Sequence, residues 1–423
     1  IIALKNPTSP EKNNPKLKTP NLDRLAEEGL ICDRTYCPNP TCTPTRASII
    51  TGNYPSQHGA WSLGTKLLED VPTLGKRLKE LKYRTGLVGK AHFEPLHSSE
   101  EFKSLEAYPT LHDYDFWKHF TGPYYGFDFI NLARNHTFEA HVGEHYALWL
   151  EEKGCENWKD YFVKPTGKKS YLHLLHHDSL WKIPEKYHYN TWIAEITNKK
   201  LEEYTKNEDK FFLWASFLDP HGPRVLPEPW NSMYDPEEME TYGPINGEHK
   251  KNPPHFNLVQ GNTTVSGKFK GIKKFLKKIK KGLKIFKIQK YYKDYKRYGL
   301  KRYGIHGLHP HLYNEKKQKQ KNAAYYGMIS LLDKYVGKIL DKLEELGIKD
   351  NTIVVFTTDH GDFMGQHGLI TKGPFMYEDL LRLPFIVRYP NKIPENRRIN
   401  SLQSLIDLAP TFLNYLGTEI PSY

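Results

Sequence analysis

The sequence predicts an α/β fold with a largely parallel central sheet and helices on both of its faces. Long apolar runs at residues 210–217 and 351–358 are typical of strands that are buried on both sides. Between such runs, apolar residues recur three or four positions apart, most clearly at 322–346, which indicates amphipathic helices. Helices that alternate with strands favour parallel pairing. At 423 residues, the chain is long enough for one large domain or two smaller ones.

Apart from the helix that follows Cys42, two helices and one strand are predicted in the first hundred residues. Residues 19–26 and 71–81 place apolar side chains at helical spacing. Residues 83–93 have the pattern of a short buried strand whose end presents Lys90 and His92. Two cationic side chains at the carboxyl end of a strand indicate a binding site, because α/β folds bind ligands there.

A second strand in the middle of the chain ends in the same way. The helix predicted at 192–204 leads into the apolar strand at 210–217, which is followed by Asp219 and His221. We expect these side chains to lie at the same edge of the sheet as those that follow the first strand.

The last hundred residues repeat the pattern of a helix followed by a strand. The helix at 322–346 ends before Gly347, a residue that suits a helix C-terminus. The β-branched strand at 351–358 then presents Asp359 and His360. Lys372, a strand at 383–388 and a helix at 402–416 complete the prediction.

The most specific local pattern lies at residues 42–52, where Cys42 is followed by Pro44, Arg46 and a terminal Thr-Gly pair. Pro44 suits the first turn of a helix, so Cys42 is expected just ahead of a helix N-terminus, where backbone donors favour anions. Arg46 adds a planar cationic fork that suits a tetrahedral oxyanion. From the spacing alone, a small buried cysteine in a turn explains the pattern equally well.

These motifs resemble those of the type I sulfatases, members of the alkaline-phosphatase-like superfamily. Their signature is Cys-x-Pro-x-Arg with a trailing Thr-Gly, as at residues 42–52. Matches to other family motifs are found at residues 19–26, 89–92, 219–221 and 359–362. The resemblance implies the same fold, and it implies that a first strand with two aspartate metal ligands lies upstream of Ile1. A smaller C-terminal subdomain is expected beyond the end of the chain for the same reason.

The resemblance also implies a reaction and a metal. The family converts the signature cysteine, here Cys42, into formylglycine, whose hydrate attacks the sulfur of a sulfate ester. It implies Cys42, Asp359 and His360 as metal ligands. The ion is most often Ca²⁺, with Mn²⁺ or Mg²⁺ as alternatives that the imidazole ligand leaves open.

The other site residues take their roles from the same resemblance. Arg46, Lys90 and Lys372 would stabilise charge on the sulfuryl oxygens. His221 would protonate the leaving alcohol, and His92 would remove a proton from the second hydroxyl of the formylglycine hydrate to release sulfate.

The positive charge of the chain is concentrated in one segment. The formal net charge is +12, but residues 268–321 alone contribute +18, so the remaining residues carry −6. Residues 268–290 place apolar side chains three or four apart between lysines, as in a basic amphipathic helix that contacts anionic membranes or polyanions. An inserted helix that packs its apolar stripe on the domain explains the same pattern and is favoured. No nucleic-acid reader fold is recognisable, so no nucleic-acid partner is expected.

Cysteine content and hydropathy exclude two further classes of protein. Four cysteines are too few for a disulfide framework, and the spacing of Cys32, Cys37 and Cys42 matches no common zinc pattern. No apolar run is long enough to span a bilayer. The compartment stays open: cytoplasmic, or periplasmic or secreted if a signal peptide lies upstream.

We therefore predict a catalytic domain in two parts, residues 1–235 and 322–423, with a pocket or lid insertion at 96–187 and a variable insertion at 236–321. The predicted activity is hydrolysis of a sulfated carbohydrate or an aryl or alkyl sulfate, after maturation by a formylglycine-generating enzyme or maturase. Two alternatives remain. One is a phosphonate or phosphate monoester hydrolase of the same superfamily, and the other is an inactive relative that binds polyanions or membranes.

Overall fold

A computed structural model describes residues 17–134, 142–162, 180–245, 247–253, 256 and 313–420. Its helices are α1 (Pro20–Glu27), α2 (Cys42–Thr51), α3 (Pro55–His58), α4 (Leu74–Glu80), α5 (Tyr114–His119), α6 (Glu144–Glu152), α8 (Tyr189–Lys206), α12 (Glu315–Glu345), α13 (Glu378–Leu381) and α14 (Leu408–Tyr415). Its strands are β1 (Leu30–Tyr36), β2 (Arg84–Gly89), β3 (Phe129–Leu132), β4 (Phe211–Ser216), β5 (Val354–Thr357), β6 (Phe363–Met364), β7 (Ile370–Thr371), β8 (Arg382–Leu383), β9 (Phe385–Arg388) and β10 (Arg397–Ser404).

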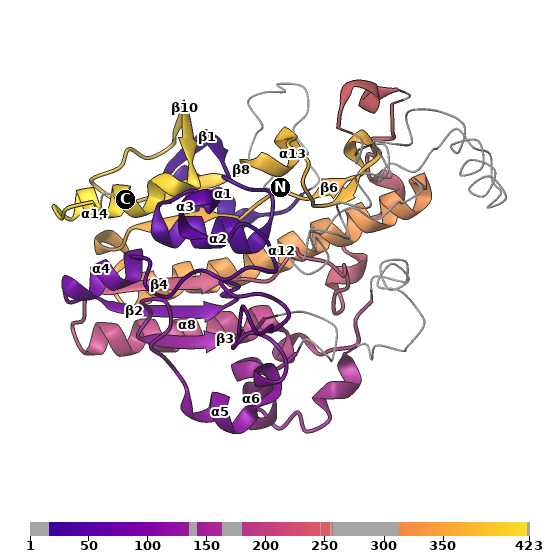
Figure 1. Ribbon diagram of the computed structural model, residues 1–423. Helices are drawn as coiled ribbons and strands as arrows, with labels where there is room; N and C mark the ends of the chain where they lie inside the picture. The colour runs from indigo at the N-terminus through magenta and orange to yellow at the C-terminus, as the bar shows by residue number, and fades with distance from the viewer. Residues whose placement is uncertain are drawn as a thin grey trace.

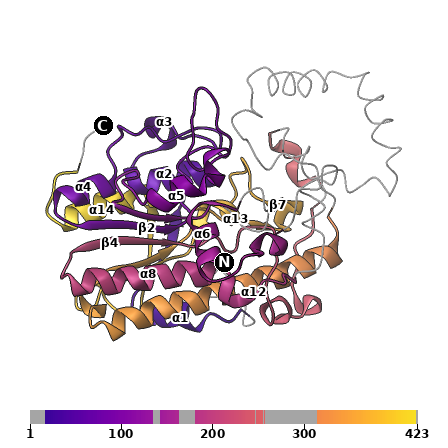
Figure 2. The same ribbon diagram turned by 90° about the horizontal axis from the view of Figure 1, so that it is seen from below.

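The elements form three layers, with the strands between two sets of helices (Figures 1 and 2). Helices α1, α8 and α12 lie on one face, and α2, α4 and α14 lie on the other (Figure 2). On the first face, α1 and α12 pack against β9 through a cluster that includes Leu22, Leu25, Leu332 and Ile386. The amphipathic pattern read from residues 322–346 therefore reflects real burial of one stripe of α12.

The strands form two principal sheets, so the prediction of one largely parallel sheet is only partly right. Strands β3, β2 and β4 pair in parallel, with Gly86 opposite both Phe129 and Leu213. The second sheet has the order β10-β1-β9-β5, and β8 also pairs with β1. There only β10 is parallel to β1, whereas β9 is antiparallel to both β1 and β5.

The antiparallel course of β9 has a local cause. Between β5 and β9, the chain forms the β6–β7 hairpin and the four-residue helix α13. A parallel return needs a crossover connection, usually a full helix packed on the sheet. This connection contains no such helix, and β9 runs back along its neighbours.

Most of the predicted helices and strands of the core are confirmed. Two corrections concern the helix predicted at 402–416 and strand β1. The helix predicted at 402–416 begins only at Leu408, because residues 397–404 pair with β1 as strand β10. Strand β1 itself, at residues 30–36, was not predicted. Its seven residues carry both charged and apolar side chains, so no continuous apolar run marks the strand.

Four further expectations concern disulfides, membrane-spanning helices, the basic segment and the domain boundaries. All four cysteines are buried and free of disulfides. Within the part of the chain that the structure describes, no helix is both long enough and apolar enough to cross a membrane. The basic helix expected at residues 268–290 lies outside the described residues, and the proposed domain boundaries stay predictions.

Candidate active site

The first turn of α2 places Cys42 in the centre of the site. Thr41 is extended, Cys42 is the first residue of the helix, and Pro44 lies in its first turn. Cys42 is thus the first residue of the helix, whereas the sequence predicted that it lies just ahead of the helix. The backbone N–H groups of a first turn have no partners within the helix, and together with the helix dipole they favour negative charge at Cys42.

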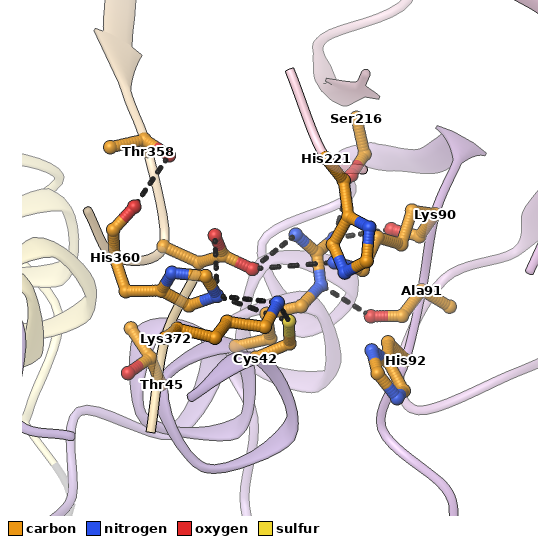
Figure 3. Close-up of polar contacts among 12 residues, drawn as sticks. Cys42, Thr45, Lys90, Ala91, His92, Ser216, His221, Thr358, His360 and Lys372 are labelled. Carbon is orange, nitrogen blue, oxygen red and sulfur yellow. Dashed lines mark hydrogen bonds and ion pairs between the residues drawn. The ribbon is translucent and has the colours of Figure 1, made fainter. Parts of the chain in front are cut away.

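The thiol of Cys42 is held between a lysine and a histidine (Figure 3). Its Sγ lies 2.8 Å from Lys372 Nζ and 3.1 Å from His360 Nε2, and these two nitrogen atoms lie 3.1 Å apart. Burial raises the pKa of Cys42, but the positive charges of Lys372 and Lys90 outweigh this effect and hold the pKa well below its usual value. The residue is therefore placed where a negatively charged group is stabilised.

The carboxylate of Asp359 lies among the same cations. One of its oxygens, Oδ2, is 3.6 Å from Lys90 Nζ and 3.7 Å from an Arg46 nitrogen. Burial raises the pKa of Asp359, but the opposing effect of His360 and Lys90 is larger and lowers the pKa below its usual value. The carboxyl group is therefore ionised. The three cationic side chains of Arg46, Lys90 and Lys372 outnumber the single carboxylate of Asp359. The site therefore carries excess positive charge, which suits an anionic substrate.

Most donors of the Arg46 guanidinium form hydrogen bonds with other residues of the protein. Its Nε donates to the carbonyl of Ala91 at 2.6 Å, and one terminal nitrogen donates to the Lys90 carbonyl and, at 2.6 Å, to Ser216 Oγ. The group also lies over the Trp214 ring, 4.8 Å from its centroid. Arg46 thus joins α2 to the ends of β2 and β4, and only its remaining nitrogen is directed at Asp359.

The side chains of Cys42, Asp359 and His360 each offer one ligand atom, all within 4.8 Å of one another. His360 Nδ1 lies 2.8 Å from the Gly361 carbonyl, to which it must donate, so Nε2 is the ring nitrogen that would bind a cation. Asp359 Oδ2 is buried without a hydrogen bond. This donor set fits one side of a divalent ion. Ca²⁺ prefers six to eight oxygen ligands, so the described residues alone do not complete a calcium site.

Two further histidines complete the cluster. His221 Nδ1 lies 2.7 Å from the Gly222 carbonyl, and burial with nearby Lys372 and Lys90 holds the pKa of His221 well below its usual value. His92 is buried in a left-handed conformation with φ 57°. Burial lowers the pKa of His92 to about 4, with Lys90 adding to the effect. Both imidazoles are neutral at pH 7 before an anion enters.

The predicted site residues that the structure brings together are Cys42, Arg46, Lys90, His92, His221, Asp359, His360 and Lys372 (Figure 3). Asp219, expected at the same rim, instead accepts hydrogen bonds from Tyr189 and Asn190 at the start of α8. Sequence reasoning missed Ser216, which fixes Arg46, and Glu106, which binds the backbone of His92. Neither stands in a recognisable motif.

Comparisons with known proteins agree on one family. The family profile described as sulfatase matches residues 11–418, nearly the whole chain. The chain belongs to the sulfatase family. It is 25% identical over 418 residues to the arylsulfatase of Clostridium perfringens strain 13, covering 96% of this chain and 72% of that protein. It is also 25% identical over 409 residues to the N-acetylglucosamine-6-O-sulfatase of Bacteroides thetaiotaomicron, covering 96% of this chain and 64% of that protein.

The sulfatase chain also shares its fold with solved structures of the superfamily. The phosphonate monoester hydrolase of Agrobacterium radiobacter matches with a TM-score of 0.68 and 21% identity, covering 98% of this chain and 71% of that one. The likeness confirms the α/β fold over the full chain. Family membership indicates a hydrolase.

Proposed function

We propose that this chain hydrolyses sulfate esters at Cys42 after oxidation of that residue to formylglycine. The observation that carries the proposal is the position of Cys42, at the start of α2 with Lys372 Nζ and His360 Nε2 within 3.1 Å of its sulfur. The thiol is thus surrounded by the groups that would bind a sulfuryl group and a cation. Formylglycine supplies the hydrated aldehyde whose hydroxyl is the nucleophile.

The cationic side chains divide the work of binding charge. Lys90 and Lys372 approach the site with their ammonium groups and would contact the sulfuryl oxygens. Arg46 has most of its donors engaged with Ala91, Lys90 and Ser216, so its part is to fix the site and add to the positive field. Asp359 and His360 would hold a divalent ion, which would add further positive charge.

The two neutral imidazoles would move protons. In the free site, His221 Nδ1 donates to the Gly222 carbonyl, so its other ring nitrogen is a base. Entry of an anion would raise the pKa of His221, because the nearby lysines that lower it would then be compensated. The protonated ring would then protonate the departing alcohol. His92, held neutral by burial, would accept the proton whose removal releases sulfate.

The substrate that we propose is a sulfated carbohydrate or an aryl sulfate. The names of the two relatives support these classes, since one is an arylsulfatase and the other a sulfatase of N-acetylglucosamine 6-O-sulfate. A second candidate is hydrolysis of phosphonate monoesters, which the fold match with the phosphonate monoester hydrolase favours. The surplus positive charge around Cys42 suits either tetrahedral anion.

The direct test is turnover of matched 4-nitrophenyl sulfate and 4-nitrophenyl phenylphosphonate by the matured protein, with Cys42→Ala as a control. We expect faster release of nitrophenol from the sulfate and loss of the activity in the Cys42→Ala variant. A higher kcat/KM for the phosphonate would contradict the proposed sulfate hydrolysis and support the second candidate, hydrolysis of phosphonate monoesters. Equal turnover by Cys42→Ala would contradict both.

A further inference from the structure

A buried carboxylate that belongs to no predicted motif supports the loop after β2. Glu106 is 1% exposed, and its Oε2 accepts a hydrogen bond from the His92 backbone N–H at 2.7 Å. Its Oε1 accepts from the N–H groups of Phe93 at 2.9 Å and Glu94 at 3.3 Å. The hydroxyl of Tyr124 donates to the same oxygen at 2.9 Å. One carboxylate thus binds three successive amides of the loop that carries His92.

The same loop is bound from its other side by a group of opposite charge. Arg46 donates to the carbonyls of Lys90 and Ala91, the two residues before His92. Glu106 also contributes to the electrostatic environment of Arg46, raising the pKa of the guanidinium that burial lowers. Hydrogen bonds that involve an ionised group are roughly twice as strong as neutral ones. The loop is therefore held by a cation at its carbonyls and by the oxygens of a carboxyl group at its amides.

The backbone of His92 needs this support. Its φ of 57° is a left-handed conformation, which costs a residue other than glycine on the order of 1–2 kcal/mol. The two ring nitrogens of His92 are buried, and their polar neighbour is Cys42, which raises the pKa of the ring against the effect of burial. The direction of the imidazole towards Cys42 therefore depends on the backbone of His92 and on packing.

We propose that Glu106 is a positioning residue for His92, which it holds in the left-handed conformation that directs the imidazole at the reacting group. The proposal rests on the proposed function, because the part of His92 in hydrolysis belongs to that function. It also gives a role to part of the 96–187 insertion, in which the sequence alone showed only a pocket or lid.

Its chemistry explains why a carboxylate stands here. A carboxylate accepts four hydrogen bonds through two oxygens and offers no donor. The amide of a glutamine would turn an N–H₂ group toward either the His92 amide or the Phe93 and Glu94 amides. Burial and nearby Glu94 raise the pKa of Glu106 to about 7, while Tyr124 and the amides of the loop lower it. The loop amides therefore favour the ionised acceptor.

The chain offers a matched control in Glu94. This glutamate is also buried, at 2% exposure, and accepts from the Leu105 N–H, the Tyr125 hydroxyl and Lys66. Its carboxylate binds none of the amides of the loop. Glu94→Gln therefore removes the same charge from the same region and leaves the His92 backbone in place.

The experiment compares Glu106→Gln and Glu94→Gln in the matured protein, with formylglycine content measured by mass spectrometry. We expect Glu106→Gln to lower kcat by 10- to 100-fold with KM within threefold of the wild type. Glu94→Gln should lower the urea midpoint by a similar amount but keep kcat within threefold. Equal losses of kcat in the two variants would overturn the proposal, because both would then act through stability alone.

A second readout does not depend on hydrolysis. In protein labelled at the histidine rings, the His92 Cε1–H signal is assigned by its loss in His92→Asn. Glu106→Gln should shift this signal, and Glu94→Gln should leave it in place. An unchanged His92 signal in Glu106→Gln would overturn the positioning role. Inactivity of the wild type towards all esters would defeat the proposed function, while the signal would still decide the role of Glu106.

Discussion

At the scale of single residues, the site is defined by how its cations are used. Arg46 is bound to backbone carbonyls and Ser216, whereas the ammonium group of Lys372 contacts Cys42 and His360. Substitution of a residue that contacts the reacting group should reduce activity more than it reduces the stability of the fold. A substitution at Lys372 therefore tests a catalytic role more clearly than one at Arg46, which also supports the fold.

Replacement of Lys372 by methionine should lower kcat/KM about 10²- to 10³-fold, the typical effect of removing one donor from charge developing in a transition state. Lys199→Met is the matched control, because Lys199 is exposed and paired with Glu195 on α8. It should leave kcat/KM unchanged. Initial rates with an aryl sulfate, measured beside circular dichroism, test this. Activity of Lys372→Met within threefold of the wild type would contradict the assigned role.

At the scale of elements, the site depends on close approach between β2 and β4. Gly89, the last residue of β2, has a φ of 104°, and a Cβ on it would lie 2.0 Å from the Ser216 carbonyl oxygen. The next residue is Lys90, whose N–H donates to that same carbonyl at 3.0 Å. The glycine thus allows the strand end to turn and present Lys90 at the site.

Substitution of Gly89 by alanine should destabilise the fold by about 3 kcal/mol or more, since strain at an unfavourable φ alone costs about 1–3 kcal/mol and the clash adds to it. Gly154→Ala is the control: its φ is 74° and nothing lies within 4 Å of the added Cβ. It should cost only about 1–2 kcal/mol. Urea unfolding of both variants provides the comparison. Similar losses would show that the contact with Ser216 is easily relaxed.

A histidine connects three further elements beside the site. His367, in the β6–β7 turn, contacts Glu248 through Nδ1 and Asp379 of α13 through Nε2 at 3.2 Å, and it stacks on Tyr377. The hydrogen bond with Asp379, and next to it Glu248, raises the pKa of His367 above its usual 6.5 against the opposing effect of burial. The charged form is therefore preferred in the folded state.

This shift predicts a pH-dependent stability. A histidine pKa that is raised on folding contributes stability fully below the unfolded pKa, and the contribution is lost as pH rises through the folded pKa. His367→Asn, which tolerates the left-handed φ of 56°, should therefore lower unfolding free energy more at pH 6 than at pH 9. Urea titrations at both pH values measure the difference. The same loss at both would mean that only the stacking on Tyr377 matters.

At the scale of the whole molecule, the sequence predicted the composition of the site better than the shape of the sheet. The motifs around Cys42, Lys90, His221 and Asp359 each follow or begin a strongly patterned element, so their convergence could be inferred from the rule for strand ends. Pairing direction could not be inferred, because it depends on whether the β5–β9 connection packs a helix on the sheet. Residues 402–404, the end of strand β10, were assigned to a helix because their partner strand β1 was not recognised.

Supporting residues were harder to predict than reacting ones. Glu106 lies 14 residues beyond His92 in a segment without clear periodicity, and its role depends on three backbone amides that the sequence does not place. Ser216 is likewise one residue in an apolar strand. Resemblance to a family identifies the residues of its motifs. It does not identify the residues elsewhere in the chain that contact those motifs, which only the structure shows.

In the proposed reaction, Cys42 is the precursor of the nucleophile. The most direct test of this role is mass spectrometry of the Cys42 peptide from protein expressed with a formylglycine-generating enzyme, with a hydrazide to trap the aldehyde. We predict an aldehyde at Cys42 and nitrophenyl sulfate turnover that rises in proportion to the aldehyde content. A thiol that stays unmodified, or turnover that does not follow the aldehyde content, would contradict it.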